Sequence, residues 1–113
     1  GQDEAAIRSY RQAEALAREL HDEDAAATAR IGIANGELDC GRLLSAIALL
    51  EALHDELAQR TGDTADALAA QAHGLHGRIL LYRGQAQDGL RHLQAAVNRV
   101  PLAADAVSYT HLT

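Results

Sequence analysis

Large aromatic and sulfur-containing side chains are nearly absent from this chain. Its 113 residues include no Phe, Trp or Met, three Tyr, one Cys and one Pro. The apolar content comes mainly from 25 Ala and 17 Leu, which are strong helix formers, whereas Val and Ile together number eight. Because sheets are enriched in β-branched and aromatic residues, this composition predicts an all-α fold. Without aromatics the core is expected to be thin, with Leu side chains packed against Ala and Gly of closely spaced helices.

Lysine is also absent, and the positive charge is dispersed. The ten basic residues are all Arg, they occur singly from Arg8 to Arg99, and the formal net charge is −6. Nucleic acids and anionic membrane surfaces select clustered positive charge, so neither is expected as a partner of this segment. The single Cys40 excludes an internal disulfide and favours a reducing, cytoplasmic location. Apolar runs such as Ala46 to Leu50 are too short to cross a bilayer.

Methionine is missing from the first position, so we expect the chain to be part of a longer protein. Arg without Lys suggests a GC-rich bacterial gene. The helical region is predicted to cover residues 1–105. Residues 106–113 depart from the Ala and Leu composition of the body and resemble translated sequencing-adapter sequence, so this tail is interpreted as non-native and given no function.

Five helices are predicted from apolar residues three and four apart and from the turn residues between them. The predicted ranges are 3–20, 23–38, 42–60, 64–83 and 86–99, with a sixth segment beginning near Leu102. The acidic run 21–24 is expected to cap the second helix, and Asp63 the fourth, with Gly62 at the end of the third. Pro101 stops the fifth helix. Short turns place successive helices antiparallel.

A two-helix unit repeats along the chain. In the odd-numbered helices, three positions recur after 40 and then 43 residues: Ala6, Tyr10 and Ala13; Ala46, Leu50 and Leu53; Gly89, Leu93 and Ala96. In the even-numbered helices, five positions recur after 41 residues: Ala27, Ile31, Ala34, Gly36 and Leu38 align with Leu68, Ala72, Leu75, Gly77 and Ile79. A repeated helical hairpin is typical of a solenoid. We expect Gly77 to lie against the helix that carries Leu93.

These residues resemble the tetratricopeptide repeat family, most closely over residues 73–101. In the first helix Gly77 stands at a small-residue position and Leu80 at the aromatic position, and Gly84 stands at the turn. In the second helix Gly89, Leu93 and Ala96 form a small-large-small set, and Pro101 closes the repeat. His73 and His76 stand where the family has Trp and Leu, and Gly89 stands in place of Ala.

The earlier unit, Asp22 to about Arg60, departs further from the family. Asp39 occupies its aromatic position, and its turn is predicted to be about two residues shorter. The repeat spacing near forty also exceeds the usual thirty-four. Longer repeats of this kind are similar to those of bacterial signalling proteins.

The resemblance implies antiparallel hairpins stacked as an α-α superhelix, of which this chain carries about two and a half repeats. It also implies a concave groove, lined by the first helix of each repeat, that binds a protein or peptide. By the 41-residue register, the residues facing this groove are Arg30, Ile33, Glu37, Gln71, Gly74, Arg78, Leu81 and Tyr82. Arg78 and Tyr82, one turn apart, could together hold a peptide carboxylate or backbone.

The leading interpretation is therefore a protein–protein interaction module, a scaffold segment without catalytic activity or cofactor. The alternative is a sensory or regulatory domain of a transcriptional regulator or nucleotide cyclase, and a third is a small helical enzyme or metal protein. Because each repeat buries its apolar face on its neighbours, exposed apolar residues are expected on the two outermost helices, where they could support self-association.

Each candidate catalytic or metal-binding residue also has a structural explanation. His73 and His76 are one turn apart, with His92 on the next predicted helix, and such residues can share a metal ion. No HExxH motif accompanies them, and His76 falls at a packing position, so they are interpreted as structural or surface histidines and no metal is expected. The acidic pairs are interpreted as caps and solvated faces, Cys40 as structural, and the Gly residues near it as packing positions because no strand precedes them.

Overall fold

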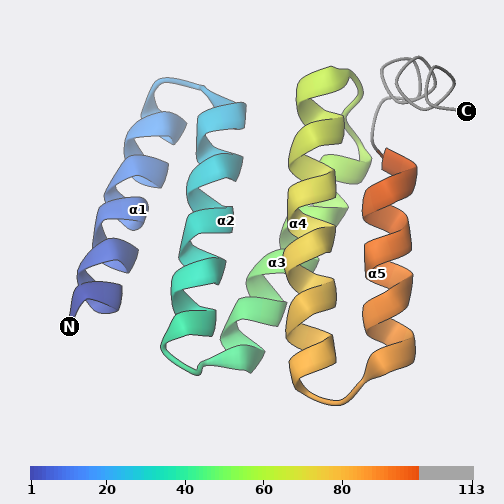
Figure 1. Cartoon of the computed structure of the whole chain (residues 1–113). Coiled ribbons are helices and arrows are strands. Elements are labelled where there is room, and N and C mark those ends of the chain that lie inside the picture. Colours follow the sequence, from blue (N-terminus) through green and yellow to red (C-terminus); the bar gives the residue numbers. More distant parts are fainter. Residues whose placement is uncertain (100–113) are drawn as a thin grey trace, which may run out of the picture.

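The computed structural model describes residues 1–99, which form five helices joined by short turns (Figure 1). The helices are α1 (Gln2–Glu19), α2 (Glu23–Asp39), α3 (Leu43–Ala58), α4 (Asp63–Tyr82) and α5 (Ala86–Arg99). The all-α prediction is confirmed for this part of the chain, and every predicted helix is present. The sixth segment near Leu102 and the tail at 106–113 lie outside the described residues.

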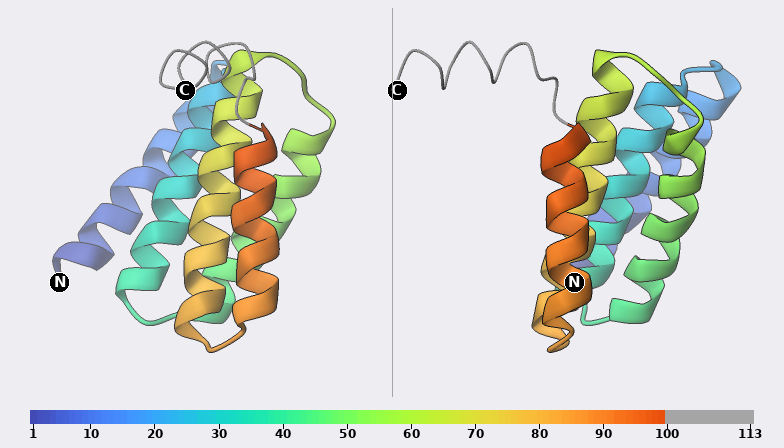
Figure 2. Two further views of the ribbon diagram at one scale, coloured as in Figure 1. Left: turned by 45° about the vertical axis from the view of Figure 1, so that its right-hand side comes forward. Right: turned by 90° about the vertical axis from the view of Figure 1, so that its right-hand side faces the viewer.

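The helices form two layers. Successive helices run in opposite directions, so α2 and α4 run the same way and lie next to each other (Figure 1). α1 flanks α2 and α5 flanks α4, while α3 packs on the other side of α2 and α4 (Figure 2). Within residues 1–99, no helix has both the length and the apolar character needed to cross a bilayer.

The core is centred on α3 and consists mainly of Leu and Ala, the two residue types that the composition predicts for it. Leu50, Leu53 and Leu57 of this helix are completely buried, together with Ala46. They pack among Ala and Leu residues of α2 and α4, including Ala34 and Ala72. Large apolar side chains remain exposed on the two outermost helices, as expected, including Leu16 on α1 and Leu90 and Val97 on α5. Others are exposed on the inner helices, among them Leu44 of α3 and Tyr82 of α4.

Three of the four turns share one backbone conformation. Each has three residues, and the middle one has a positive φ: 55° at His21, 80° at Gly41 and 79° at Gly84. The N–H of the third turn residue donates to the carbonyl five residues earlier: Asp22 to Ala17 (2.8 Å), Arg42 to Glu37 (2.8 Å) and Gln85 to Leu80 (2.9 Å). This is the Schellman pattern that ends many helices. The prediction of a shorter turn after the second helix was therefore wrong.

The equal turns fix the register between the α2–α3 and α4–α5 hairpins. Gly41 and Gly84 are 43 residues apart, so the even-numbered helices correspond at 43 residues, as the odd-numbered helices do, and not at 41. In this register Ala34, which is completely buried, corresponds to Gly77. Gly36, which the sequence comparison paired with Gly77, faces α1 instead, since a Cβ there would lie 2.6 Å from Cγ1 of Ile7.

The close approach of α4 and α5 occurs at two glycines. A Cβ on Gly77 would lie 2.8 Å from the carbonyl oxygen of Gly89 and 2.8 Å from Cγ of Leu93. The expectation that Gly77 lies against the Leu93 helix is thereby confirmed. Small residues at this crossing let the two backbones touch, and Leu93 fills the adjacent space.

The cap of α2 agrees with the sequence prediction, and the cap of α4 does not. The Asp22 carboxylate accepts a hydrogen bond from the Ala25 N–H at 3.0 Å, so the acidic run caps α2 as predicted. At α4 the cap residue is Gly62, with a φ of 110°, and Asp63 is already the first helical residue. The prediction that Asp63 caps this helix was wrong. α3 ends at Ala58, so Gly62 lies in the following turn and takes the cap position before Asp63.

His21 offers a test of the shared turn. It is the one non-glycine residue with positive φ among residues 1–99, and this conformation costs an L-residue about 1–2 kcal/mol. His21→Gly removes this cost, but glycine loses more conformational entropy on folding. The net effect expected is a rise in the unfolding free energy of about 0.5–1 kcal/mol. Gly41→Ala is the matched control and should lower it by about 1 kcal/mol. Urea unfolding measures both, and a stabilising Gly41→Ala would contradict the assignment.

Candidate functional site

An open groove follows the junction of α2 and α4. Four helices contribute to it and α3 does not: the lining residues are Tyr10, Thr28, Ile31, Gly32, Asn35, Gln71, Gly74, Leu75, Arg78 and Leu93. Since α3 packs on the other side of α2 and α4, the groove lies on the face of the molecule away from it (Figure 2). This groove is open to solvent.

The two central helices present equivalent positions to the groove. α4 contributes Gln71, Gly74 and Arg78, which lie on one face of the helix. The residues 43 positions earlier are Thr28, Ile31 and Asn35, and all three also line the groove. The register set by the turns therefore also relates the two walls of the groove.

Of the residues predicted to face a groove, those on α4 divide into two groups. Gln71, Gly74 and Arg78 line the groove. Leu81 instead faces α5, because its Cγ lies 3.0 Å from the Cβ position of Gly89. Tyr82 is the last residue of α4 and is 71% exposed, outside the groove lining. Arg78 and Tyr82 are both exposed one turn apart on α4, but only Arg78 lines the groove, so their joint action on one ligand group stays a prediction.

The structure places the three predicted α2 residues away from the groove. Ile33 is 1% exposed and Glu37 3% exposed, and Arg30 forms ion pairs with Glu56 and, at 3.9 Å, with Glu14. Their assignment used the 41-residue register. An error of two residues turns a helix by about 200°, which moves each assigned side chain to the opposite face.

Glu37 has a structural role that its burial requires. Arg42 donates to both of its carboxylate oxygens, at 2.7 Å and 3.0 Å, and also to Glu4 at 2.9 Å. The Arg42 guanidinium, through these hydrogen bonds, holds the pKa of Glu37 and of Glu4 below their usual values. A paired buried carboxylate of this kind ties α1 and α2 to the start of α3 and is not available to a ligand.

The chemistry of the groove is mostly neutral. Asn35 and Gln71 supply side-chain amides, while Ile31 and Leu75 supply apolar surface. Arg78 is the one charged residue of the lining, and it forms no ion pair with a carboxylate of residues 1–99. The groove thus combines groups that can bind a peptide backbone with one cation that can bind an anionic group.

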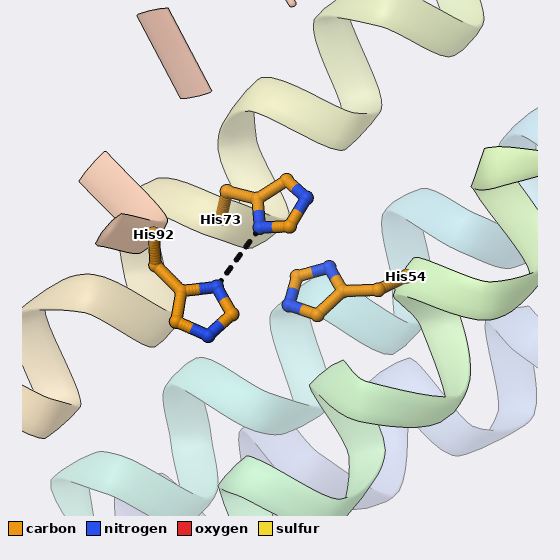
Figure 3. A group of neighbouring side chains, drawn as sticks. All are labelled: His54, His73 and His92. Carbon is orange, nitrogen blue, oxygen red and sulfur yellow. Dashed lines mark hydrogen bonds between the residues drawn. The ribbon is translucent and has the colours of Figure 1, made fainter. Parts of the chain in front are cut away.

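A second constellation consists of four histidines between α3, α4 and α5, three of which, His54, His73 and His92, are drawn in Figure 3. His54 belongs to α3, His73 and His76 to α4, and His92 to α5. Nε2 of His54 lies 2.9 Å from Nδ1 of His76, and Nδ1 of His73 lies 3.0 Å from Nδ1 of His92. The rings also stack, with centroids 3.9 Å apart for His54 and His73 and 3.8 Å apart for His76 and His92. We call these four residues the histidine cluster.

Burial keeps the histidine cluster neutral. Desolvation, followed by repulsion from neighbouring rings, lowers the pKa of His54 to about 3 and that of His76 to about 4. Desolvation also lowers the pKa of His73 and of His92. At neutral pH all four rings therefore carry lone pairs that can accept a proton or bind a metal.

Sequence reasoning identified three members of the histidine cluster and missed the fourth. The spacing of His73 and His76, and the position of His92 on the next helix, indicated that these three could meet. His54 is 19 residues before His73 on a different helix, and no local pattern places it beside them. Its position follows from the crossing of α3 over α4, which only the tertiary structure shows.

Comparisons of the chain with family models, curated proteins and solved structures found no match.

Proposed function

We propose that this chain is a protein-interaction module of the tetratricopeptide type, which holds an extended segment of a partner protein in the groove between α2 and α4. The observation that carries the proposal is the repetition of the groove wall. Thr28, Ile31 and Asn35 on α2 are matched at 43 residues by Gln71, Gly74 and Arg78 on α4. Two parallel helices that present equivalent positions to one groove can contact successive residues of an extended peptide.

The groove favours a peptide over a small polar metabolite. Asn35 and Gln71 lie on opposite walls, and each amide can both donate to a carbonyl and accept from an N–H. Ile31 and Leu75 give apolar surface between them for a small side chain. The groove is open along its length, whereas sites for small molecules usually bury most of the ligand.

Arg78 gives the partner segment a preferred charge. The rest of the lining is uncharged, so an acidic side chain or terminal carboxylate near Arg78 would form a charge-assisted hydrogen bond. The formal net charge of the whole chain is −6, so this attraction is local to the groove. We therefore propose that the bound segment carries at least one carboxylate next to apolar or small residues.

Selection from a random peptide display library tests this proposal. Peptides enriched on the chain are expected to share an acidic residue, and Arg78→Glu should weaken their binding by more than about tenfold, because a hydrogen bond to a charged group contributes about 1.5–3 kcal/mol. Fluorescence anisotropy with the enriched peptides measures the change. Arg8→Glu, which alters an exposed arginine of α1 outside the groove lining, is the control with the same change of charge.

Two results would contradict the proposal. One is that no peptide is enriched on the chain over a surface that carries no protein. The other is that enriched peptides bind Arg78→Glu and an Asn35→Ala variant as tightly as the unaltered chain, which would place the binding surface elsewhere.

A further inference from the structure

We propose that His54, His73 and His92 bind one divalent transition-metal ion of the zinc class, and that His76 is a positioning residue for His54. Each of three helices supplies one ligand, so the ion would join α3, α4 and α5. This site is independent of the peptide groove, whose lining contains none of the four histidines.

The nitrogens of the three rings lie near enough to one another to share a metal ion. One nitrogen from each of His54, His73 and His92 can be chosen so that all three lie within 4.8 Å of one another. Histidine nitrogens bind Zn²⁺ at about 2.0–2.1 Å, which sets ligand nitrogens roughly 3.3 Å apart in a tetrahedron. Figure 3 shows the three rings close together on three separate helices. The rings of His54 and His73 are stacked with planes 7° apart, so side-chain rotation has to turn their in-plane lone pairs toward a common ion.

One nitrogen in the cluster lacks the partner that its burial demands. Nδ1 of His54 is buried and has no hydrogen bond within the described residues. A buried polar atom left unsatisfied costs about 1–3 kcal/mol, and coordination of an ion removes that cost. Nε2 of the same ring is held by His76 at 2.9 Å. A ligand imidazole whose other nitrogen is fixed by a second group is the usual arrangement in metal sites.

The ligand set selects the kind of ion. Across residues 1–99, hydrogen bonds of the four rings go only to one another and none to a carboxylate. Neutral imidazoles suit Zn²⁺, Cu²⁺ and Ni²⁺, whereas Mg²⁺ and Ca²⁺ require oxygen ligands. Three histidines leave a fourth position of a tetrahedral ion for water.

The cluster also has an opening to solvent. A surface pocket between α3, α4 and α5 is lined by His76 and His92 together with two acidic and two basic residues, Glu51, Asp88, Arg83 and Arg91. Asp88 pairs with Arg91 at 2.9 Å. The pocket therefore gives solvent access to His92, one of the three proposed ligands, and to the positioning residue His76.

Metal titration of the purified, untagged chain tests the site. Isothermal titration calorimetry with Zn²⁺ is expected to show one ion per chain. A hundredfold excess of free ion over the dissociation constant should raise the melting temperature by about 10 °C, because the folded state alone holds the complete site. Co²⁺ as a spectroscopic probe should give the visible absorption of a four-coordinate ion. Mg²⁺ should produce neither effect.

Variants separate this site from adventitious binding. His54→Leu and His92→Leu should weaken Zn²⁺ binding by more than about 100-fold, and His76→Gln by about 10–100-fold because it only orients a ligand. His21→Gly removes a histidine of the α1–α2 turn and should leave binding unchanged. Circular dichroism of the metal-free variants checks that they fold.

The unaltered chain supplies an independent readout if a variant fails to fold. Zn²⁺ should shift the imidazole ¹⁵N resonances of His54, His73 and His92 in NMR spectra while leaving His21 in place. Absence of binding, loss of binding in His21→Gly, or resonance shifts confined to residues outside the histidine cluster would overturn the proposal.

Discussion

Gly77→Ala is expected to lower the unfolding free energy by about 1–3 kcal/mol, although alanine is the better helix former. The added Cβ would lie 2.8 Å from the carbonyl oxygen of Gly89, which is backbone and cannot rotate away. It would also lie 2.8 Å from Cγ of Leu93. Inserting a methyl group into such a contact forces the helices apart, and overpacking of this kind costs typically about 1–3 kcal/mol.

The matched control for this change is on the same helix. Gly74→Ala adds the same methyl group less than one turn away, where no atom lies within 4 Å of the new Cβ. It should therefore stabilise the chain by up to about 1 kcal/mol through helix propensity alone. Urea unfolding compares the two variants, and hydrogen exchange should show that Gly77→Ala loosens α5 more than α2. Equal stability of the two variants would show that α4 and α5 do not meet at Gly77.

Acid is expected to destabilise the metal-free chain between pH 6.5 and 4.5. In the unfolded chain a histidine has its ordinary pKa near 6.5, whereas burial lowers the pKa of His54 to about 3 and that of His76 to about 4. Within this window the unfolded state binds protons that the folded state does not, so the contribution to stability is complete above pH 6.5 and is lost as the pH falls.

The expected loss of unfolding free energy depends on how many protons the unfolded state binds that the folded state does not. Each histidine that stays neutral in the folded state contributes a slope of at most about 1.4 kcal/mol per pH unit. Partial access of solvent to the cluster reduces the effect, so we expect a loss of about 2–3 kcal/mol over the window. The lowered pKa values of Glu4 and Glu37 act in a lower range, because those carboxylates lose their contribution only as the pH falls below about 4.5.

Urea unfolding at several pH values, with a chelator present, measures this dependence. The variant His54→Leu/His76→Leu removes the two most strongly shifted rings and should flatten the pH profile between 6.5 and 4.5. His21→Gly is the control and should keep the slope of the unaltered chain. A profile that is equally steep in the double variant would assign the acid sensitivity to groups outside the histidine cluster.

The groove and the histidine cluster use different faces of α4. Gln71, Gly74 and Arg78 face the groove, while His73 and His76 face α3 and α5. If both proposals hold, an ion that joins α3 to α5 would fix the orientation of the helix that forms one wall of the groove. Peptide affinity measured with and without Zn²⁺ would show whether the two sites are coupled.

The sequence by itself determined the helices, the close contact of Gly77 with the Leu93 helix, and three of the α4 residues that line the groove, Gln71, Gly74 and Arg78. These features depend on periodicity within one helix and on turn residues such as Gly84, which are local properties of the chain. The tertiary structure was needed for the 43-residue register, because a glycine at 36 and a glycine at 77 look equivalent in sequence although they pack on different neighbours. Since each residue turns a helix by about 100°, a shift of two residues exchanged Thr28, Ile31 and Asn35 for buried or ion-paired positions. The fourth histidine was decided by tertiary structure for a related reason: the crossing of α3 over α4 brings His54 to its partners, and a crossing is set by packing between helices and not by any spacing along one of them.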